Sequence, residues 1–213
     1  MEYVARTDSN PFGQSPPCER FVPGYGDVNA DFHLVGDHPG IHGGERSKIP
    51  FTDRPWSATF FETLVRAGLL QEADLDSSRF ASYRTFLSYL HMCVPENGIP
   101  DADSYARMEP FFDSELRAIT AHVLIPVGER ATAHVLKTYT STPVAASPEM
   151  EEYHATEIRG AGWLVIPVKH PADWSDDDAE AFVERIQSLE EADYRQVSDL
   201  GRFMPGGDAY FVR

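Results

Sequence analysis

Four short apolar runs, separated by segments with helical periodicity, constrain the fold of this chain most strongly. They cover residues 31–36 (DFHLVG), 84–94 (RTFLSYLHMCV), 122–128 (HVLIPVG) and 163–168 (WLVIPV). The segments between and after them predict helices at residues 57–70, 103–120, 129–137 and 175–189. Apolar strands that alternate with helices are typical of a parallel sheet covered on both faces. The sequence therefore predicts an α/β fold with three α/β/α layers around a central, four-stranded, mainly parallel sheet.

The length of 213 residues suits one domain, spanning residues 1–213. We expect residues 1–30, rich in Pro, Gly and Asn, to form an irregular N-terminal arm. The C-terminal tail, 190–213, is expected to pack across the sheet edge or to lie on single-stranded nucleic acid, and we favour packing. We also expect loops at 37–56 and 138–160. Ser57 and Ser175 are predicted helix N-caps, Ser175 together with Asp178 in a capping box.

The balance of charge is strongly acidic. Thirty-four acidic residues face eighteen basic ones, for a formal net charge of −16, and only three of the basic residues are lysines. A negative field opposes binding to phosphates. Acid excess with scarce lysine also keeps a protein hydrated in molar salt, where the Debye length is about 3 Å. We interpret the charge as halophilic adaptation, and it carries no information about the ligand.

No apolar run approaches the ~20 residues that span a membrane, and the N-terminus has no signal-peptide core. We therefore expect a cytoplasmic protein without a membrane partner. A monomer is expected. Its two cysteines, Cys18 and Cys93, lie far apart in the sequence, and in a cytosolic chain such cysteines are usually buried and unpaired, so we expect no disulfide.

Chemistry-bearing residues follow the first and fourth predicted strands. The loop 37–51 begins with Asp37 and ends with Phe51, and residues 169–174 (KHPADW) contain His170. In open parallel sheets, ligands bind beyond the carboxyl ends of the strands. We therefore expect Asp37, Phe51 and His170 to converge in one pocket. Structural roles are the competing interpretations: a turn acid for Asp37, a core anchor for Phe51 and a surface histidine for His170.

The ordered motifs resemble the uracil-DNA glycosylase superfamily, most closely its prokaryotic iron–sulfur branch (family 4-like). Residues 22–40 (VPGYGDVNADFHLVGDHPG) resemble the segment in which a strand ends in Gly-Glu-Ala-Pro-Gly. Residues 49–51 (IPF) resemble the Pro-Phe of that branch, and residues 165–174 (VIPVKHPADW) resemble its His-Pro-Ser motif. Residues 107–136 resemble its middle helix and strand. The resemblance covers roughly residues 18–190.

This resemblance implies a hydrolase of base excision repair that flips a deaminated base out of DNA and cleaves its N-glycosidic bond. It implies that Asp37 stabilises the sugar cation or positions a water, and that His170 donates a hydrogen bond to the leaving base. Phe51 would stack on the flipped base. The implied contacts to the base and the DNA are Gly36, His38, Pro39, Gly40, Phe51, Tyr89 and Pro171.

Four departures from the family pattern leave an alternative open. Asp37 replaces a glutamate, His38 replaces a small residue, and Ala172 replaces the serine of His-Pro-Ser. Tyr89 replaces an asparagine that reads the amide edge of uracil, and a tyrosine lacks the paired donor and acceptor. The alternative is a non-catalytic, glycosylase-like module that binds nucleic acid or a nucleotide.

The resemblance also implies a cofactor that this chain does not match. The related branch holds an iron–sulfur cluster with four cysteines. Cys93 matches the third ligand, and Met108 stands at the fourth. Cys18 matches either the first or the second ligand; if it matches the second, Ser15 stands at the first. We interpret Cys18 and Cys93 as remnants and expect no cluster and no other cofactor, with packing around Met108 in its place.

A third alternative is a metal-dependent hydrolase on the same sheet. His33, His38 and His42, with Asp37, are residue types that bind zinc. Their spacing fits no metal motif, so we expect no metal site.

Overall fold

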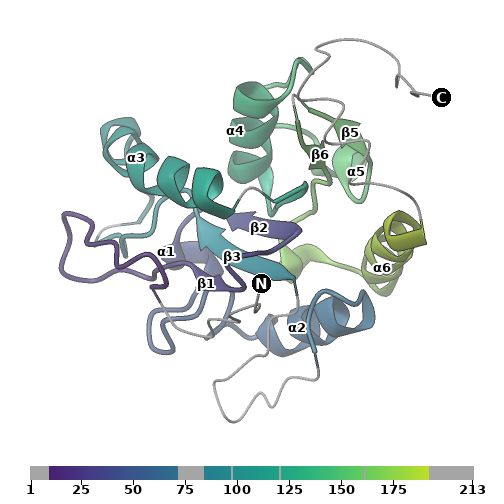
Figure 1. The fold of residues 1–213 in the computed structure, drawn as a ribbon, viewed down its shortest axis with the longest axis horizontal. Coiled ribbons are helices and arrows are strands. Elements are labelled where there is room, and N and C mark those ends of the chain that lie inside the picture. Colours follow the sequence, from purple (N-terminus) through teal and green to yellow (C-terminus); the bar gives the residue numbers. More distant parts are fainter. Residues whose placement is uncertain (1–9, 72–83, 97, 120, 161, 192–213) are drawn as a thin grey trace.

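The computed structural model describes residues 10–71, 84–96, 98–119, 121–160 and 162–191. Its centre is a sheet in which the strand order is β1-β3-β2-β4-β6-β5 (Figure 1). The strands are β1 (Tyr25–Gly26), β2 (Phe32–Gly36), β3 (Thr85–Tyr89), β4 (Val123–Pro126), β5 (Ile158–Arg159) and β6 (Leu164–Val165).

The four inner strands pair in parallel and correspond to the four predicted runs. The expected strand count was wrong, because among the described residues the sheet has six strands. The two additional strands, β1 and β5, pair antiparallel at the two edges. Each is two residues long, too short for an alternation of apolar residues to be recognised. β1 lies in the arm that was expected to be irregular, and β5 in an expected loop.

Helices cover both faces of this sheet. They are α1 (Pro39–His42), α2 (Ser57–Arg66), α3 (Ala102–Ile119), α4 (Glu129–Tyr139), α5 (Met150–Tyr153) and α6 (Asp176–Glu191), with a 3-10 turn, η1, at Pro171–Asp173. The predicted helices are confirmed as α2, α3, α4 and α6, although α2 ends at Arg66 rather than at residue 70. α1 and α5 lie in expected loops, and each has only four residues.

Alternating side chains of β2 build the two cores. Phe32 and Leu34 belong to a cluster shared with α2 and α6, and Val35 belongs to one shared with α3 and α4. All three side chains are buried. Figure 1 shows α3 and α4 on one side of the sheet and α2 and α6 on the other. The three-layer prediction is confirmed.

The two predicted N-caps have different outcomes. In the capping box, the Asp178 N–H donates to Ser175 Oγ at 3.2 Å, and the Ser175 N–H donates to Asp178 Oδ2 at 2.8 Å. Ser57 does not cap α2. Its hydroxyl donates to the Phe51 carbonyl at 2.7 Å and accepts the Arg54 N–H at 3.0 Å, so it ties the preceding loop to the helix.

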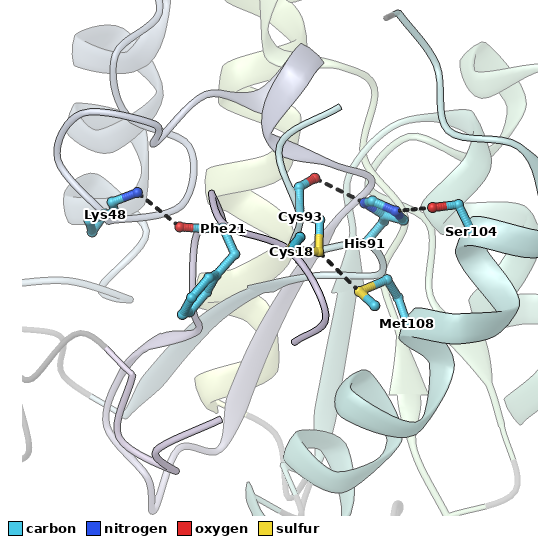
Figure 2. The surroundings of a disulfide bond; sticks show 7 residues. All are labelled: Cys18, Phe21, Lys48, His91, Cys93, Ser104 and Met108. Atoms are coloured by element: carbon cyan, nitrogen blue, oxygen red, sulfur yellow. Dashed lines mark hydrogen bonds between the residues drawn. A yellow bond between two sulfur atoms is a disulfide. The ribbon is translucent and has the colours of Figure 1, made fainter. Parts of the chain in front are cut away.

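Cys18 and Cys93 form a disulfide, contrary to our expectation (Figure 2). The N-terminal arm runs antiparallel to the segment that follows β3. Val22 donates its N–H to the Met92 carbonyl and Val94 donates to the Arg20 carbonyl, both at 2.9 Å. This pairing brings together two cysteines that lie 75 residues apart. The prediction failed because separation along the chain does not report distance in the fold.

Two expectations concern the chain as a whole. Across the described ranges, no helix has the length and apolar character needed to cross a membrane. The structure describes the chain as far as Glu191, so the rest of the expected tail (190–213) lies outside the described residues.

Candidate active site

The carboxyl end of β2 leads directly into the site. A Cβ on Gly36 would lie 2.7 Å from Tyr89 Cε1 and 2.8 Å from His42 Nδ1, so the two rings require a glycine there. Pro39 begins α1 at a position where its missing N–H is not needed. Arg54 donates to the carbonyls of Pro39, at 2.9 Å, and Gly40. The short helix is therefore fixed by the loop that follows it.

Asp37 is buried, and both of its carboxylate oxygens have partners. The Tyr105 hydroxyl donates to Oδ1, and Arg130 Nε lies 3.4 Å from Oδ2. The Arg130 guanidinium also lies over the Tyr105 ring, 4.7 Å from its centre. Burial raises the pKa of Asp37, while the Tyr105 hydrogen bond and the Arg130 charge oppose that rise. These two partners orient the carboxylate and favour its ionised form.

Sequence reasoning missed both partners. Tyr105 lies in the second predicted helix (103–120), and nothing in its sequence pattern indicates a polar contact. Arg130 lies in the first turn of α4, just beyond the carboxyl end of β4. The rule that ligands bind beyond strand ends would have included this position.

His42, at the end of α1, lies between several rings. It is fully buried, and its Nδ1 accepts the Asp37 N–H at 2.9 Å. Its ring is nearly parallel to those of His170 and Tyr89, with centroids 5.0 and 6.0 Å away. Burial lowers the pKa of His42 well below its ordinary value, and the nearby His170 and Arg54 lower it further. The ring is therefore a neutral imidazole at physiological pH.

His170 opens the η1 turn after β6. Its Nδ1 accepts the Ala172 N–H at 3.1 Å, and its ring hydrogen-bonds the Ile41 backbone. Burial lowers its pKa. Pro171 is buried at the first position of η1 and shapes this turn.

The structure brings Asp37, His42 and His170 together at one cavity of about 500 Å³. The other lining residues come mainly from α1 and from the β4–α4 connection: Ile41, Val127, Gly128, Glu129, Arg130, Ala146 and Ser147. The cavity therefore lies where β2, β4 and β6 end, as the strand-end rule predicts.

Phe51 is not among the described residues that line this cavity. Its ring is fully buried and packs against His42, Tyr89 and Phe60, with centroids 5.4, 5.4 and 5.6 Å away. The Tyr89 hydroxyl accepts the Phe51 N–H at 2.7 Å and donates to the Gly43 carbonyl at 3.1 Å. In this structure Phe51 anchors the loop, and stacking on a base stays a prediction.

His38 is buried, and neither of its ring nitrogens has a hydrogen-bond partner. A Cβ on Gly40 would lie 2.7 Å from His38 Nδ1, so this ring packs directly over the Gly40 backbone. Contact of His38 with a base stays a prediction.

The histidines of the β2 region do not assemble a metal centre. Within the described part of the chain, no three His, Cys, Asp or Glu side chains are placed to hold a metal ion. His33 Nε2 instead makes a 2.7 Å hydrogen bond with Ser88 Oγ across the β2–β3 pair. The structure therefore does not support the metal-dependent alternative.

The cysteines do not fit an iron–sulfur cluster of four thiolates. The chain has two cysteines, and the disulfide joins them. The Met108 sulfur lies 3.5 Å from Cys93 Sγ in a buried cluster, and His91 joins the Cys93 carbonyl to Ser104 on α3 (Figure 2). Met92, Cys93 and Met108 pack together in this region. That the protein works without a cofactor stays a prediction.

A family model described as the Uracil DNA glycosylase superfamily matches residues 23–190, a range that includes Asp37, His42 and His170. The chain belongs to the uracil-DNA glycosylase superfamily. The resemblance inferred from the motifs is therefore confirmed, and with it the α/β fold. Membership of this superfamily assigns the chain to the N-glycosyl hydrolases.

Curated relatives support the same assignment. The chain is 28% identical over 185 residues to the type-5 uracil-DNA glycosylase of Pyrobaculum aerophilum. The aligned region covers 85% of this chain and 77% of that protein. It is 26% identical over 179 residues to the type-4 uracil-DNA glycosylase of Saccharolobus solfataricus, covering 84% and 74%. It is 30% identical over 106 residues to the type-5 enzyme of Thermus thermophilus, covering 49% and 48%.

Proposed function

We propose that this superfamily member hydrolyses the N-glycosidic bond of uracil or another deaminated base in DNA, as a step of base excision repair. The observation that carries the proposal is the buried carboxylate of Asp37, which lines the cavity and is held by Tyr105 and Arg130. The names of the relatives supply the substrate class.

The chemistry needs such a carboxylate. Breaking the bond between C1′ and the base leaves the electron pair on the base and positive charge on the sugar. The ionised Asp37 stabilises that charge, or accepts the proton of the water that attacks C1′. Hydrogen-bond donors at the cavity stabilise the base as it leaves with negative charge. The target base reaches such a site only when it is flipped out of the stack.

A second candidate, the non-catalytic binding module, is favoured by one observation. Tyr89 and His42 pack directly against the Phe51 ring, and all three side chains are buried. A base that stacks on Phe51 would need the space that these rings occupy. A protein that keeps this packing in solution would bind a nucleotide only in the outer cavity.

A single-turnover assay of base release tests the proposal. The substrates are single- and double-stranded oligonucleotides that carry uracil, hypoxanthine or xanthine, in molar potassium chloride, with alkaline cleavage of the abasic product. We expect release by the wild type and a loss of at least about 100-fold in Asp37→Ala. Asp113→Asn on the outer part of α3 is the matched control and should retain the wild-type rate.

Two outcomes would contradict this proposal. Full activity of a folded Asp37→Ala variant would show that the site is assigned to the wrong carboxylate. No release from any substrate by the folded wild type would favour the binding module.

A further inference from the structure

The disulfide between Cys18 and Cys93 borders a second cavity, of about 370 Å³, which both cysteines line. Cys18 is half-buried, and its two neighbours in the chain are exposed. Cys93 is only 7% exposed, and its Sγ lies 3.5 Å from the sulfur of Met108. A small molecule in this cavity therefore reaches the disulfide, and it reaches Cys18 more easily than Cys93.

A thiol in this cavity can open the disulfide by exchange. Its thiolate attacks Cys18 Sγ and forms a mixed disulfide, while the bond to Cys93 breaks and its electron pair leaves on Cys93 Sγ. A second thiol group then attacks the mixed disulfide and frees Cys18. The two external thiols end joined and oxidised, and the two cysteines take up the electrons and protons that those thiols lost. The reaction needs no other reactant.

His91 joins Cys93 to the first turn of α3. Its Nδ1 lies 3.0 Å from the Cys93 carbonyl oxygen, and its Nε2 lies 2.8 Å from Ser104 Oγ (Figure 2). Burial lowers the pKa of His91, so the ring is neutral. Because a carbonyl only accepts, Nδ1 carries the proton and Nε2 accepts the Ser104 hydroxyl. His91 therefore ties α3 to the residue that carries the disulfide.

The same two elements hold Asp37. The His91 N–H donates to the Asp37 carbonyl at 3.0 Å, and the His91 ring packs edge-on against Tyr105, with centroids 5.3 Å apart. Tyr105 follows Ser104 directly on α3, and its hydroxyl donates to the Asp37 carboxylate. The position of the first turn of α3 therefore sets the position of the Tyr105 hydroxyl, and His91 fixes that turn.

We propose that the Cys18–Cys93 disulfide is a redox switch for the site at Asp37. A low-molecular-weight thiol that enters the second cavity opens the bond, and the opened form holds the Asp37 carboxylate less firmly. His91 and Tyr105 are the positioning residues that connect the two sites. This inference goes beyond the proposed function, and only its effect on base release rests on that function.

The opening is local. The N-terminal arm stays paired with the segment after β3 through two backbone hydrogen bonds, from Val22 to Met92 and from Val94 to Arg20. These bonds lie on both sides of Cys93 and do not involve its side chain. Loss of the disulfide therefore loosens the contact between the arm, His91 and α3 while the chain remains folded.

The first test measures access of a thiol to the folded protein. Arg107, Glu96 and Asp101 line the cavity with charges of both signs, so the probe is the neutral thiol 2-mercaptoethanol. Peptide mass spectrometry after an acid quench should find the mixed disulfide on Cys18. Urea well below the unfolding transition should leave the reaction rate unchanged. A mixed disulfide on Cys93 alone, or reaction only as the protein unfolds, overturns the proposal.

The second test measures the effect on the site. We expect dithiothreitol, a dithiol, to lower the single-turnover rate of base release by roughly 3- to 30-fold and to move its acid limb to higher pH. The double variant Cys18→Ser, Cys93→Ser should match the reduced wild type and should not respond to dithiothreitol. Equal rates and acid limbs in the oxidised and reduced wild type overturn the proposal. Circular dichroism that shows global unfolding on reduction also overturns it.

His91→Phe tests the route between the two sites. The variant keeps a ring of similar size but loses the hydrogen bonds to the Cys93 carbonyl and to Ser104. We expect a lowered rate in the oxidised form and no further loss on reduction. His134→Phe, at a half-buried histidine on α4, is the matched control and should keep the full response to dithiothreitol. A full response in folded His91→Phe overturns the route through His91.

A readout that does not depend on activity decides the case in which the wild type releases no base. Tyr105 on α3 and Arg130 on α4 both lower the pKa of Asp37, and neutral His42 on α1 accepts its backbone N–H. A weaker hold by Tyr105 should therefore raise the pKa of the Asp37 carboxyl on reduction, which carboxyl ¹³C spectra follow. A higher pKa in the reduced protein supports the switch even though the proposed function has then failed. The same pKa in both redox states overturns it.

Discussion

The Tyr105 hydroxyl on α3 donates a hydrogen bond to Oδ1 of Asp37, which lies 68 residues earlier in the chain. This bond joins the helix layer to the loop that follows β2. The same tyrosine ring supports the guanidinium of Arg130, which in turn faces the second carboxylate oxygen of Asp37. The orientation of the proposed catalytic carboxylate therefore depends on two helices, α3 and α4.

Tyr105→Phe should change the pH dependence of base release. Burial raises the pKa of Asp37, and the hydrogen bond from the Tyr105 hydroxyl lowers it. Removal of the hydroxyl should therefore raise the pKa of Asp37 further. Because the ionised carboxylate is the active form, we expect the acid limb of the pH–rate profile to move to higher pH. The measurement is the single-turnover rate from about pH 5 to about pH 9. Tyr153→Phe on α5 is the control, and an acid limb that coincides with that of the wild type would refute the role of Tyr105.

Tyr89→Phe should destabilise the fold. The change leaves the Phe51 N–H and the Gly43 carbonyl without their buried partner, at a cost of about 1–3 kcal/mol. Urea titration in potassium chloride measures the free energy of unfolding. Tyr139→Phe, whose half-buried hydroxyl contacts Asp113, should have a smaller effect. Equal losses in the two variants would argue that the Tyr89 hydroxyl does not hold the loop.

Loss of the disulfide should lower stability substantially. The bond closes a loop of 75 residues, and the chain-entropy model predicts about 4 kcal/mol for such a loop. We expect the double variant Cys18→Ser, Cys93→Ser and the reduced wild type to unfold at similar, lower urea concentrations. Free-thiol titration of the oxidised protein is the control. Unfolding midpoints that do not depend on reductant would contradict this expectation.

Glu115→Gln should flatten the pH dependence of stability. Glu115 on α3 is buried, its Oε2 has no hydrogen-bond partner, and burial raises its pKa from 4.5 to about 8. Between these values the folded state binds more protons than the unfolded state, so the free energy of unfolding falls as pH rises. Thermal unfolding across this window should show that fall in the wild type and a smaller one in the variant. Parallel curves would indicate that Glu115 is ionised in the folded protein.

Local patterns were sufficient for the main elements but not for the short ones. β2, β3, β4 and β6 are apolar runs with turn residues after them, and such runs can be recognised without knowledge of their neighbours. β1 and β5 are two-residue strands that exist because a neighbouring strand supplies hydrogen bonds. Ser57 shows the same limit, because its hydroxyl finds partners in the loop, Phe51 and Arg54, instead of capping α2.

The sequence by itself determined the order of strands and helices, and from it the edge of the sheet where Asp37 and His170 meet. Parallel strands joined by helices place their carboxyl ends together, so this convergence follows from connectivity. Only the tertiary structure decided which side chains face the cavity. The Phe51 ring packs against His42, and Cys18 forms a disulfide with Cys93. The Tyr105 hydroxyl donates a hydrogen bond to Asp37. Each of these contacts depends on how side chains from separate elements pack together, and neither periodicity nor spacing along the chain contains that information.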